Sequence, residues 1–190
     1  MTADSRIPGL PNADDVRDMV SRIVDGVLGQ SAAPAVEETP AVPGDEPTRE
    51  GIAIGADHGG YPLKERLAFR LREQGHAVLD CGTDSTAAVD YPDFAHAVAS
   101  AVATGKARWG VIVDGAGIGS AMVANKVPGV RAALVTDPWT ATMARRHNDA
   151  QILCLGGRVI GPEIALDIVR TWVETAFAGG RHQRRLDMLS

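Results

Sequence analysis

The sequence predicts an α/β fold in which helices cover both faces of a five-stranded parallel sheet. From residue 51 onward, short apolar and β-branched runs alternate with helical segments, which is typical of strands buried on both faces. The expected strands are 52–56, 77–79, 109–113, 130–135 and 152–155. Because a helical segment separates successive runs, the connections are crossovers of the kind that parallel sheets require.

Each expected helix is marked by an apolar repeat or by a boundary residue. Leu63, Leu67 and Leu71 recur at helical spacing, and Gly75 closes that segment. Pro162 is a good first-turn residue for the last helix. The remaining helices are expected at 91–104, from residue 120, around 140–146 and at 162–175.

Composition and charge narrow the functional class. The chain has 190 residues, 45% of them apolar and 23% charged, with a net charge of −5 that argues against a general nucleic-acid-binding protein. No run approaches the roughly 18 apolar residues of a membrane span, and no signal segment opens the chain, so we expect a soluble, cytoplasmic protein. Two cysteines, Cys81 and Cys154, cannot form a disulfide framework or a zinc site alone, and we expect small buried side chains there. We expect no metal and no cofactor.

Residues 1–30 predict a separate amphipathic helix. Asn12 and Asp15 resemble a capping box, and Gly29 stands where a C-terminal cap belongs. One face is apolar, and its principal positions are Val16, Val20, Ile23 and Val27. Residues 31–49 contain four prolines among Ala, Glu and Asp, so we interpret them as an extended linker to a domain at 50–190.

Polar residues gather where the predicted strands end, which is where parallel sheets bind ligands. Asp57 and His58 follow the first strand, and a glycine-rich turn at 115–119 follows the third. Glycines let backbone N–H groups converge on an anion, although a tight turn needed only for packing explains the same residues. The spacing fits neither a dinucleotide fingerprint nor a phosphate-binding P-loop.

Basic residues near the end of the chain are candidates for gripping a phosphate. The segment 181–185 is the densest basic cluster, and Arg158 follows two glycines after the fifth strand. Arginine forks are a common grip on phosphate, although such clusters are most often simply solvated. His147, Asn148 and Asp149 end a helix, where they equally suit a C-terminal cap.

Taken together, these motifs resemble the ribose-5-phosphate isomerase B / galactose-6-phosphate isomerase family. The matching stretches are 54–61, 89–93, 115–119, 124–126, 146–149 and 179–185, which together span most of residues 51–190. The resemblance implies a Rossmann-like three-layer α/β/α sandwich and a homodimer or tetramer with shared active sites. It also implies cofactor-free aldose–ketose isomerisation of a phosphorylated sugar, with ribose 5-phosphate and ribulose 5-phosphate as the expected pair.

The resemblance also implies roles for individual residues. His147 opens the furanose ring with help from Asp57, while Asn148 and the N–H groups of residues 115–119 hold the enediolate oxygens. The implied phosphate contacts are His58, Arg158, Arg181 and Arg185, some of them reaching in from the neighbouring subunit. The other residues expected to contact the substrate are Tyr91, Gly115, Gly117, Gly119 and Ser120.

One departure from the family pattern concerns the catalytic base. Many members carry a cysteine immediately before the glycine-rich loop, where this chain has Asp114. A second family solution uses a glutamate at the start of the following helix, where this chain has Ser120, and the loop's usual hydroxyl residue is replaced by Ala116. Three interpretations follow. Asp114 is the base, activated by partial burial; the site is retuned for another sugar phosphate, such as a tetrose or hexose phosphate; or the domain binds sugar phosphates without turning them over.

The N-terminal helix and linker resemble the encapsulation peptides that load enzymes into bacterial microcompartments. On this interpretation, residues 12–29 dock on a shell protein and the enzyme resides inside the compartment. Three alternatives stay open: the helix folds back on its own domain, joins the dimer interface, or lies on a membrane. Its polar face mixes Asp with Arg, which disfavours a membrane surface.

Overall fold

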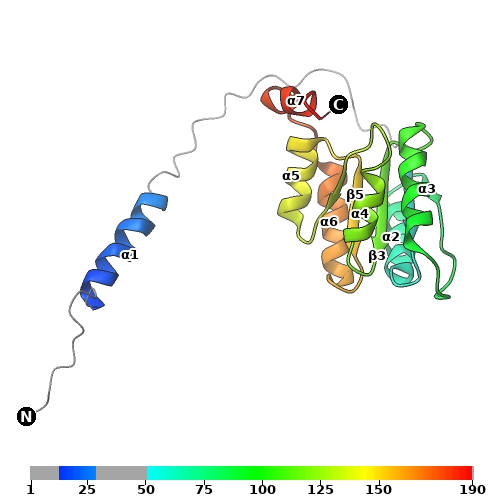
Figure 1. The fold of residues 1–190 in the computed structure, drawn as a ribbon. Coiled ribbons are helices and arrows are strands. Elements are labelled where there is room, and N and C mark those ends of the chain that lie inside the picture. The colour runs from blue at the N-terminus through cyan, green and yellow to red at the C-terminus, as the bar shows by residue number, and fades with distance from the viewer. Residues whose placement is uncertain (1–12, 29–50, 190) are drawn as a thin grey trace, which may run out of the picture. The chain divides into compact units, whose positions relative to one another are not determined.

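The structure is a computed structural model that describes residues 13–28 and 51–189, with side-chain environments in the first segment given for 14–22. The chain divides into two units, Met1–Asp45 and Glu46–Ser190. The larger unit contains the sheet and its covering helices (Figure 1). The expected linker at 31–49, Asn12 of the capping box and Gly29 lie outside the described residues, so the predicted division into three parts stays a prediction.

The larger unit is built on a five-stranded, all-parallel sheet, which confirms the predicted fold class. The strand order is β2-β1-β3-β5-β4. The bounds are β1 Ile52–Ala56, β2 Val78–Asp80, β3 Trp109–Asp114, β4 Ala132–Leu134 and β5 Ile152–Gly156. The three inner strands, β1, β3 and β5, are almost fully buried because helices cover both of their faces.

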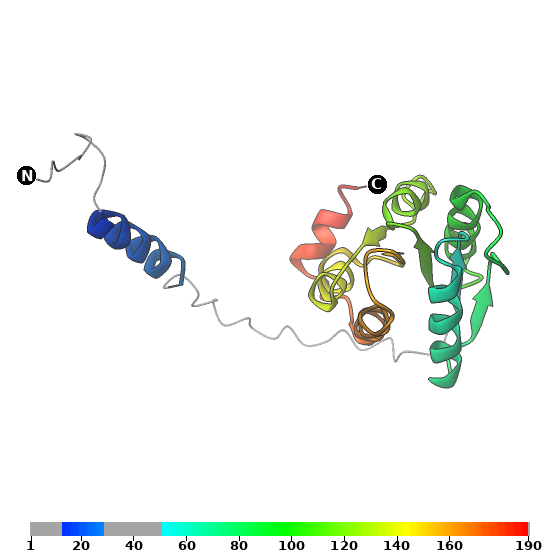
Figure 2. The same ribbon diagram turned by 90° about the horizontal axis from the view of Figure 1, so that it is seen from below.

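Two helical layers enclose the sheet (Figure 2). Helices α2 (Tyr61–Glu73), α5 (Pro138–Asn148) and α6 (Pro162–Glu174) cover one face and share an apolar core with it. Helices α3 (Tyr91–Ala103) and α4 (Ile118–Ala124) cover the other face. Cys154 is buried inside β5, whereas Cys81 follows β2 and is only half-buried, so the expectation of burial holds for one cysteine.

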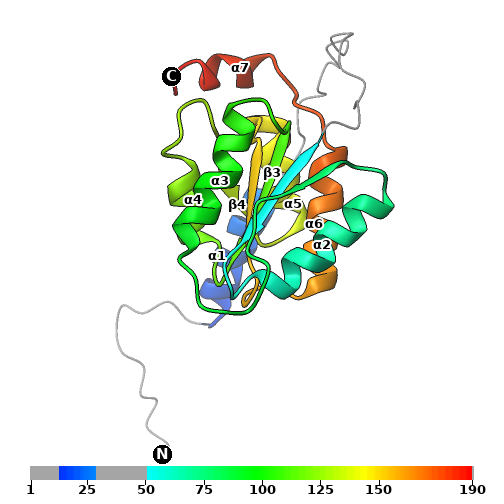
Figure 3. The same ribbon diagram turned by 90° about the vertical axis from the view of Figure 1, so that its right-hand side faces the viewer.

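A short helix at the C-terminal end was not predicted from the sequence. Helix α7 (Arg181–Leu186) lies beyond the ends of the strands, on the side where the strands begin (Figure 3). Gly179 and Gly180 have φ angles of 61° and 54°, a left-handed region that glycine adopts without strain. They turn the chain after α6, and the N–H of Ala178 donates to the carbonyl of Arg146 at the end of α5.

The described part of the N-terminal unit is helix α1 (Ala13–Leu28), as its apolar periodicity predicts. Asp14 and Asp15 lie in its first turn, where they favour the helix dipole. Val16, Met19 and Val20 are about half exposed. No described helix is both long enough and apolar enough to cross a lipid bilayer.

Candidate functional site

The glycine-rich loop between β3 and α4 is organised around the carboxylate of Asp114. The N–H groups of Ala116 and Gly117 donate to Oδ1 of this aspartate, the first at 2.8 Å. The N–H and the hydroxyl of Ser120 donate to Oδ2 at 3.0 and 2.5 Å. A carboxylate offers about four acceptor positions, so these four donors saturate Asp114 within its own loop.

The hydrogen bonds to Asp114 reduce the number of loop donors that are available to a substrate. Ser120 is completely buried and its hydroxyl donates to Asp114, so in this structure its side chain supports the carboxylate, and its expected substrate contact stays a prediction. The expectation that the whole loop binds enediolate oxygens stays a prediction; in this structure the amides of Ala116 and Gly117 donate to Asp114. Within the described part of the chain, the N–H groups of Gly115, Ile118 and Gly119 have no hydrogen-bond acceptor. The amides of Ile118 and Gly119, in the first turn of α4, are therefore among the donors that stay available to a ligand.

Asp57 and His58 are held at the end of β1, beside the glycine-rich loop. The N–H of Gly60 donates to Oδ1 of Asp57 at 2.9 Å, and the Nδ1 atom of His58 lies 3.3 Å from the backbone of Val89. Gly60 is required here, because a Cβ at that position would lie 2.1 Å from the carbonyl oxygen of Val113. The close approach of the two backbones therefore places Asp57 and Asp114 at the same edge of the sheet.

Arg158 and Tyr91 complete this edge. Arg158 is anchored by its own N–H, which donates to the carbonyl of Gly115. A Cβ built on Gly59 would lie 3.3 Å from Oδ1 of Asp57 and 3.7 Å from Nη2 of Arg158, so both side chains border Gly59. The guanidinium is exposed and makes no ion pair with a described residue. On the other side, a Cβ on Gly119 would lie 2.6 Å from the ring of Tyr91, which therefore packs directly on the loop.

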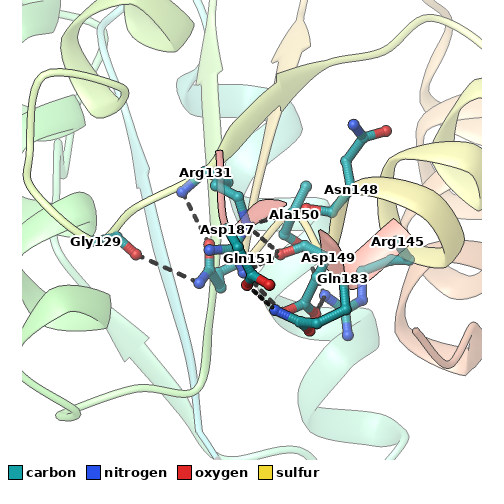
Figure 4. Close-up of polar contacts among 9 residues, drawn as sticks. All are labelled: Gly129, Arg131, Arg145, Asn148, Asp149, Ala150, Gln151, Gln183 and Asp187. Carbon is teal, nitrogen blue, oxygen red and sulfur yellow. Dashed lines mark hydrogen bonds and ion pairs between the residues drawn. The ribbon is translucent and has the colours of Figure 1, made fainter. Parts of the chain in front are cut away.

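His147 and Asn148 lie at the end of α5, on a turn that is held by ion pairs. Asp149 caps the helix with a left-handed φ of 43°. Its carboxylate pairs with Arg131 at 2.7 Å and with Arg145 at 2.8 Å, as Figure 4 shows. Arg131 also donates to the carbonyl of Asn148 at 3.0 Å. The turn that carries His147 and Asn148 is thus fixed by both of its neighbouring arginines.

Arg145 forms the buried part of that support. Its guanidinium lies 4.8 Å from the ring centre of Trp109 and 5.8 Å from that of Trp172. Burial lowers the pKa of Arg145, and Asp149 opposes this shift by stabilising the positive charge. The side chain also donates to the carbonyl of Ala150 at 2.9 Å. An aromatic and carboxylate cage therefore keeps the end of α5 in place.

Helix α7 brings its basic residues to the same end of α5. His182 is buried, and its ring stacks on that of His147 with centroids 4.2 Å apart and planes inclined by 6°. Arg181 and Arg185 precede and follow His182 in the sequence and are exposed, and Arg146 precedes His147 on α5. The result is an imidazole, an amide and several guanidinium groups on one surface.

The predicted site residues therefore fall into two groups at opposite edges of the sheet. We call them the carboxyl-edge half-site (Asp57, His58, Tyr91, Asp114, Gly115, Gly117, Gly119 and Arg158) and the amino-edge half-site (His147, Asn148, Arg181, Arg185 and, unpredicted, His182). The first lies where β1, β3 and β5 end, and the second lies just before β5 begins. Helix α5 spans the distance between them, and its 11 residues extend about 16 Å. A phosphorylated pentose is too short to bridge both groups within one chain.

Sequence reasoning missed the network that supports the amino-edge half-site. The sequence marks Asp149 only as part of a helix end and does not predict its ion pairs with Arg131 and Arg145. The role of His182 depends on the unpredicted helix α7. The adjacent pair Gly179 and Gly180 was the available signal for a sharp turn that ends with α7 docked on α5. Among the described residues, no group of three or more His, Cys, Asp or Glu side chains is placed to hold a metal ion.

Comparisons with known proteins give consistent results. A family model described as Ribose/Galactose Isomerase matches residues 52–189. Ribose-5-phosphate isomerase B of Escherichia coli (strain K12) is 42% identical over 139 residues, covering 73% of this chain and 93% of that protein. D-erythrulose-4-phosphate isomerase of Pectobacterium atrosepticum is 44% identical over 130 residues, covering 68% of this chain and 86% of that protein.

Solved structures show the same similarity. The ribose-5-phosphate isomerase B of Clostridium thermocellum has a TM-score of 0.73 and 50% identity, covering 73% of this chain and 94% of that one. The Mycoplasma genitalium enzyme, solved with bound ribulose 5-phosphate, has a TM-score of 0.71 and 40% identity, covering 73% and 93%.

Proposed function

The chain belongs to the ribose/galactose isomerase family and is an aldose–ketose isomerase, and from this premise we propose that it interconverts ribose 5-phosphate and ribulose 5-phosphate. The reaction moves a proton between C1 and C2 through a cis-enediolate. It needs a base above that carbon and hydrogen-bond donors directed at the developing negative charge. Arginine side chains hold the phosphate, and the proposed chemistry uses no cofactor.

The observation that carries the proposal is the separation of the two half-sites. Each holds only part of the required chemistry: Asp57, Arg158 and the free loop amides at one edge, and His147 and Asn148 at the other. We propose that a homodimer joins the carboxyl-edge half-site of one copy to the amino-edge half-site of the other. Four apolar residues on α4, at the end of β4 and at the start of α5 are exposed and support a buried interface there: Ile118, Met122, Leu134 and Trp139.

In the assembled site, each group has a distinct task. His147 and Asp57 exchange the protons that open the furanose ring, and Asn148 with the amides of Ile118 and Gly119 stabilises the enediolate. His58, Arg158, Arg181 and Arg185 surround the phosphate, which suits guanidinium forks.

The base that moves the C1–C2 proton is Asp114 in this proposal, as the sequence pattern suggested. To accept a proton from carbon, the carboxylate must exchange one of its four loop donors for the substrate. The Ser120 hydroxyl is the donor that can turn away without any movement of the backbone. A general base contributes roughly 10²–10⁴ in rate, so its removal has a large and measurable effect.

Mixing two inactive variants tests the shared site. Asp57→Asn damages only the carboxyl-edge half-site, and His147→Asn damages only the amino-edge half-site. In a mixed dimer, one site collects both lesions while the other is intact, so random pairing restores about one quarter of the wild-type activity. The matched control is the double variant Asp57→Asn/His147→Asn alone. It stays inactive because every site in its dimer carries both lesions. Failure of the single variants to complement each other contradicts a site shared between copies.

A panel of phosphorylated aldoses with four to six carbons tests the choice of substrate. Turnover of ribose 5-phosphate with incorporation of solvent deuterium at C1 of ribulose 5-phosphate supports the proposal. The 44% identity to a D-erythrulose-4-phosphate isomerase favours a four-carbon sugar as the second candidate. Turnover of erythrose 4-phosphate without that of ribose 5-phosphate would assign the four-carbon function. Absence of deuterium incorporation from every substrate in the panel contradicts both.

For helix α1 we propose docking on a microcompartment shell protein. The support is the resemblance to encapsulation peptides together with the exposed Val16, Met19 and Val20, which offer an apolar surface to a partner. The double variant Val16→Asp/Val20→Asp is expected to abolish co-sedimentation with shell while isomerase activity is unchanged. Asp18→Ala, on the polar face, is the matched control and keeps co-sedimentation. Loss of isomerase activity in the double variant instead indicates that α1 belongs to the enzyme's own structure.

A further inference from the structure

The imidazole rings of His147 and His182 form a close, nearly parallel stack. Their centroids are 4.2 Å apart and their planes are nearly parallel, at 6°. His182 is buried, whereas His147 is half-buried, so part of the His147 ring is accessible at the amino-edge half-site. The buried ring therefore acts as a flat support beneath the exposed one.

Hydrogen bonding and charge both favour a neutral His182. The Nε atom of Arg181 donates to Nε2 of His182 at 3.4 Å, which requires a lone pair on that nitrogen. Burial of the ring, followed by the positive potential of His147, Arg181, Arg185 and Arg146, lowers the pKa of His182. A neutral ring can stack under His147 without repelling it when His147 carries a proton.

The position of His182 is determined by the backbone on both sides of it. Gly179 and Gly180 make the turn that starts α7, and the N–H of His182 donates to the carbonyl of Gly179 at 3.0 Å. Leu186, one turn further along α7, is also buried. The contact of Ala178 with Arg146 ties this turn to the helix that carries His147.

We propose that His182 is a positioning residue for ring opening, whose stacked ring fixes the plane in which His147 delivers its proton. The inference rests on the proposed function. In the step itself, Asp57 accepts the proton of the O1 hydroxyl and a C1=O bond forms. The C1–O4 bond breaks with its electron pair on O4, which takes a proton from His147. The N–H of His147 must point along the breaking bond, and the stack restricts rotation out of that direction.

Sugar chemistry supplies an internal control. The phosphate of a tetrose 4-phosphate occupies O4, so this sugar has no hydroxyl with which to close a five-membered ring. Its isomerisation needs the enediolate step but no ring opening. A residue that acts only through ring opening therefore affects ribose 5-phosphate and spares erythrose 4-phosphate.

Two substitutions separate stacking from other roles. His182→Ala removes the supporting ring, and we expect kcat for ribose 5-phosphate to fall at least about tenfold, since general acid catalysis contributes roughly 10²–10⁴. His182→Phe keeps a flat ring without charge or hydrogen bonds and is expected to stay within about threefold of wild type. KM is expected to change little in both. Gln183→Ala, on the exposed face of α7, is the matched control and leaves turnover unchanged.

Several outcomes overturn the proposal. Equal loss on ribose 5-phosphate and erythrose 4-phosphate indicates a structural role, and a rise in KM alone indicates phosphate binding. If His182→Phe is as impaired as His182→Ala, the imidazole itself is needed rather than its stacking. Wild-type turnover of ribose 5-phosphate establishes separately whether the proposed function holds.

A measurement on the substrate-free protein tests the stack even if ribose 5-phosphate is not a substrate. Proton NMR of wild type is expected to show the ring resonances of His147 displaced upfield by the ring current of His182. The displacement disappears in His182→Ala and persists in His182→Phe. Ring resonances of His147 that are the same in wild type and His182→Ala contradict the stacked arrangement.

Discussion

Ser120 donates its hydroxyl to Asp114 across 2.5 Å, and both residues are buried. The same serine donates its backbone N–H to the same carboxylate oxygen at 3.0 Å. Asp114 therefore holds the first turn of α4 against the end of β3, in addition to any part that it takes in proton transfer.

Asp114→Asn is expected to lower kcat at least about 10²-fold with little change in phosphate binding, because the variant loses the proton acceptor. It is also expected to lower the free energy of unfolding by about 1–3 kcal/mol, because an amide NH₂ faces donors in either orientation. Steady-state kinetics and urea denaturation measure the two effects. Ser120→Ala is the control: it keeps the carboxylate, so kcat stays within about threefold if Asp114 is the base. An equal fall of kcat in both variants identifies loop geometry as the cause.

Arg158→Ala is expected to raise KM for the phosphorylated sugar at least about tenfold while kcat changes less, because the exposed guanidinium contributes mainly to binding phosphate. Arg158→Lys keeps the charge but loses the fork, so it recovers only part of the affinity. Arg170→Ala removes an exposed arginine that pairs with Asp167 and Glu174 on α6, away from both half-sites, and serves as the control. Unchanged KM in Arg158→Ala removes this arginine from the phosphate site.

Asp80→Asn is expected to reduce the free energy of unfolding by about 1–2 kcal/mol, because Lys64 is buried and donates to both oxygens of Asp80 at 2.8 and 2.7 Å. Burial lowers the pKa of Lys64, but hydrogen bonds to Asp80 and Glu65 outweigh it, so the net pKa is raised. The stabilisation is therefore present below the unfolded-state pKa of about 10.4 and is lost as the pH rises through the higher folded-state pKa. Urea denaturation at pH 7 and at alkaline pH measures both effects. Glu73→Gln, in an exposed pair with Arg70, is the control and has little effect.

Asp137 caps α5 by accepting from the N–H and the hydroxyl of Thr140, at 2.8 and 2.9 Å. These hydrogen bonds, the backbone one first, lower the pKa of Asp137. Its contribution to stability is present above the unfolded-state value of about 3.9 and is lost as the pH falls through the lower folded-state pKa. Asp137→Asn is expected to weaken this acid dependence while leaving kcat near wild type. An unchanged acid denaturation profile contradicts the capping role.

Much of the fold follows from local pattern. The inner strands are continuous apolar runs, and a strand buried on both faces cannot be built from anything else, so β1, β3 and β5 were predictable. The short helix α7 was not, because five of its six residues are charged or polar and they carry no apolar repeat of useful length. Its formation depends on the Gly179–Gly180 turn, on the stacking of His182 against His147 of α5, and on burial of Leu186.

Some features of the candidate site likewise follow from the sequence, and others depend on packing. Sequence alone determined that Asp57 and the glycine-rich loop share an edge, because the carboxyl ends of parallel strands must meet there. The opposite edge for His147 and Asn148 follows from the same topology, since a helix that joins two parallel strands runs back across the sheet before it ends. Only the tertiary structure decided that the oxygens of Asp114 face inward to four loop donors and that His182 lies under His147. Hydrogen-bond direction and ring stacking depend on atoms brought together by packing, and periodicity along the chain does not encode them.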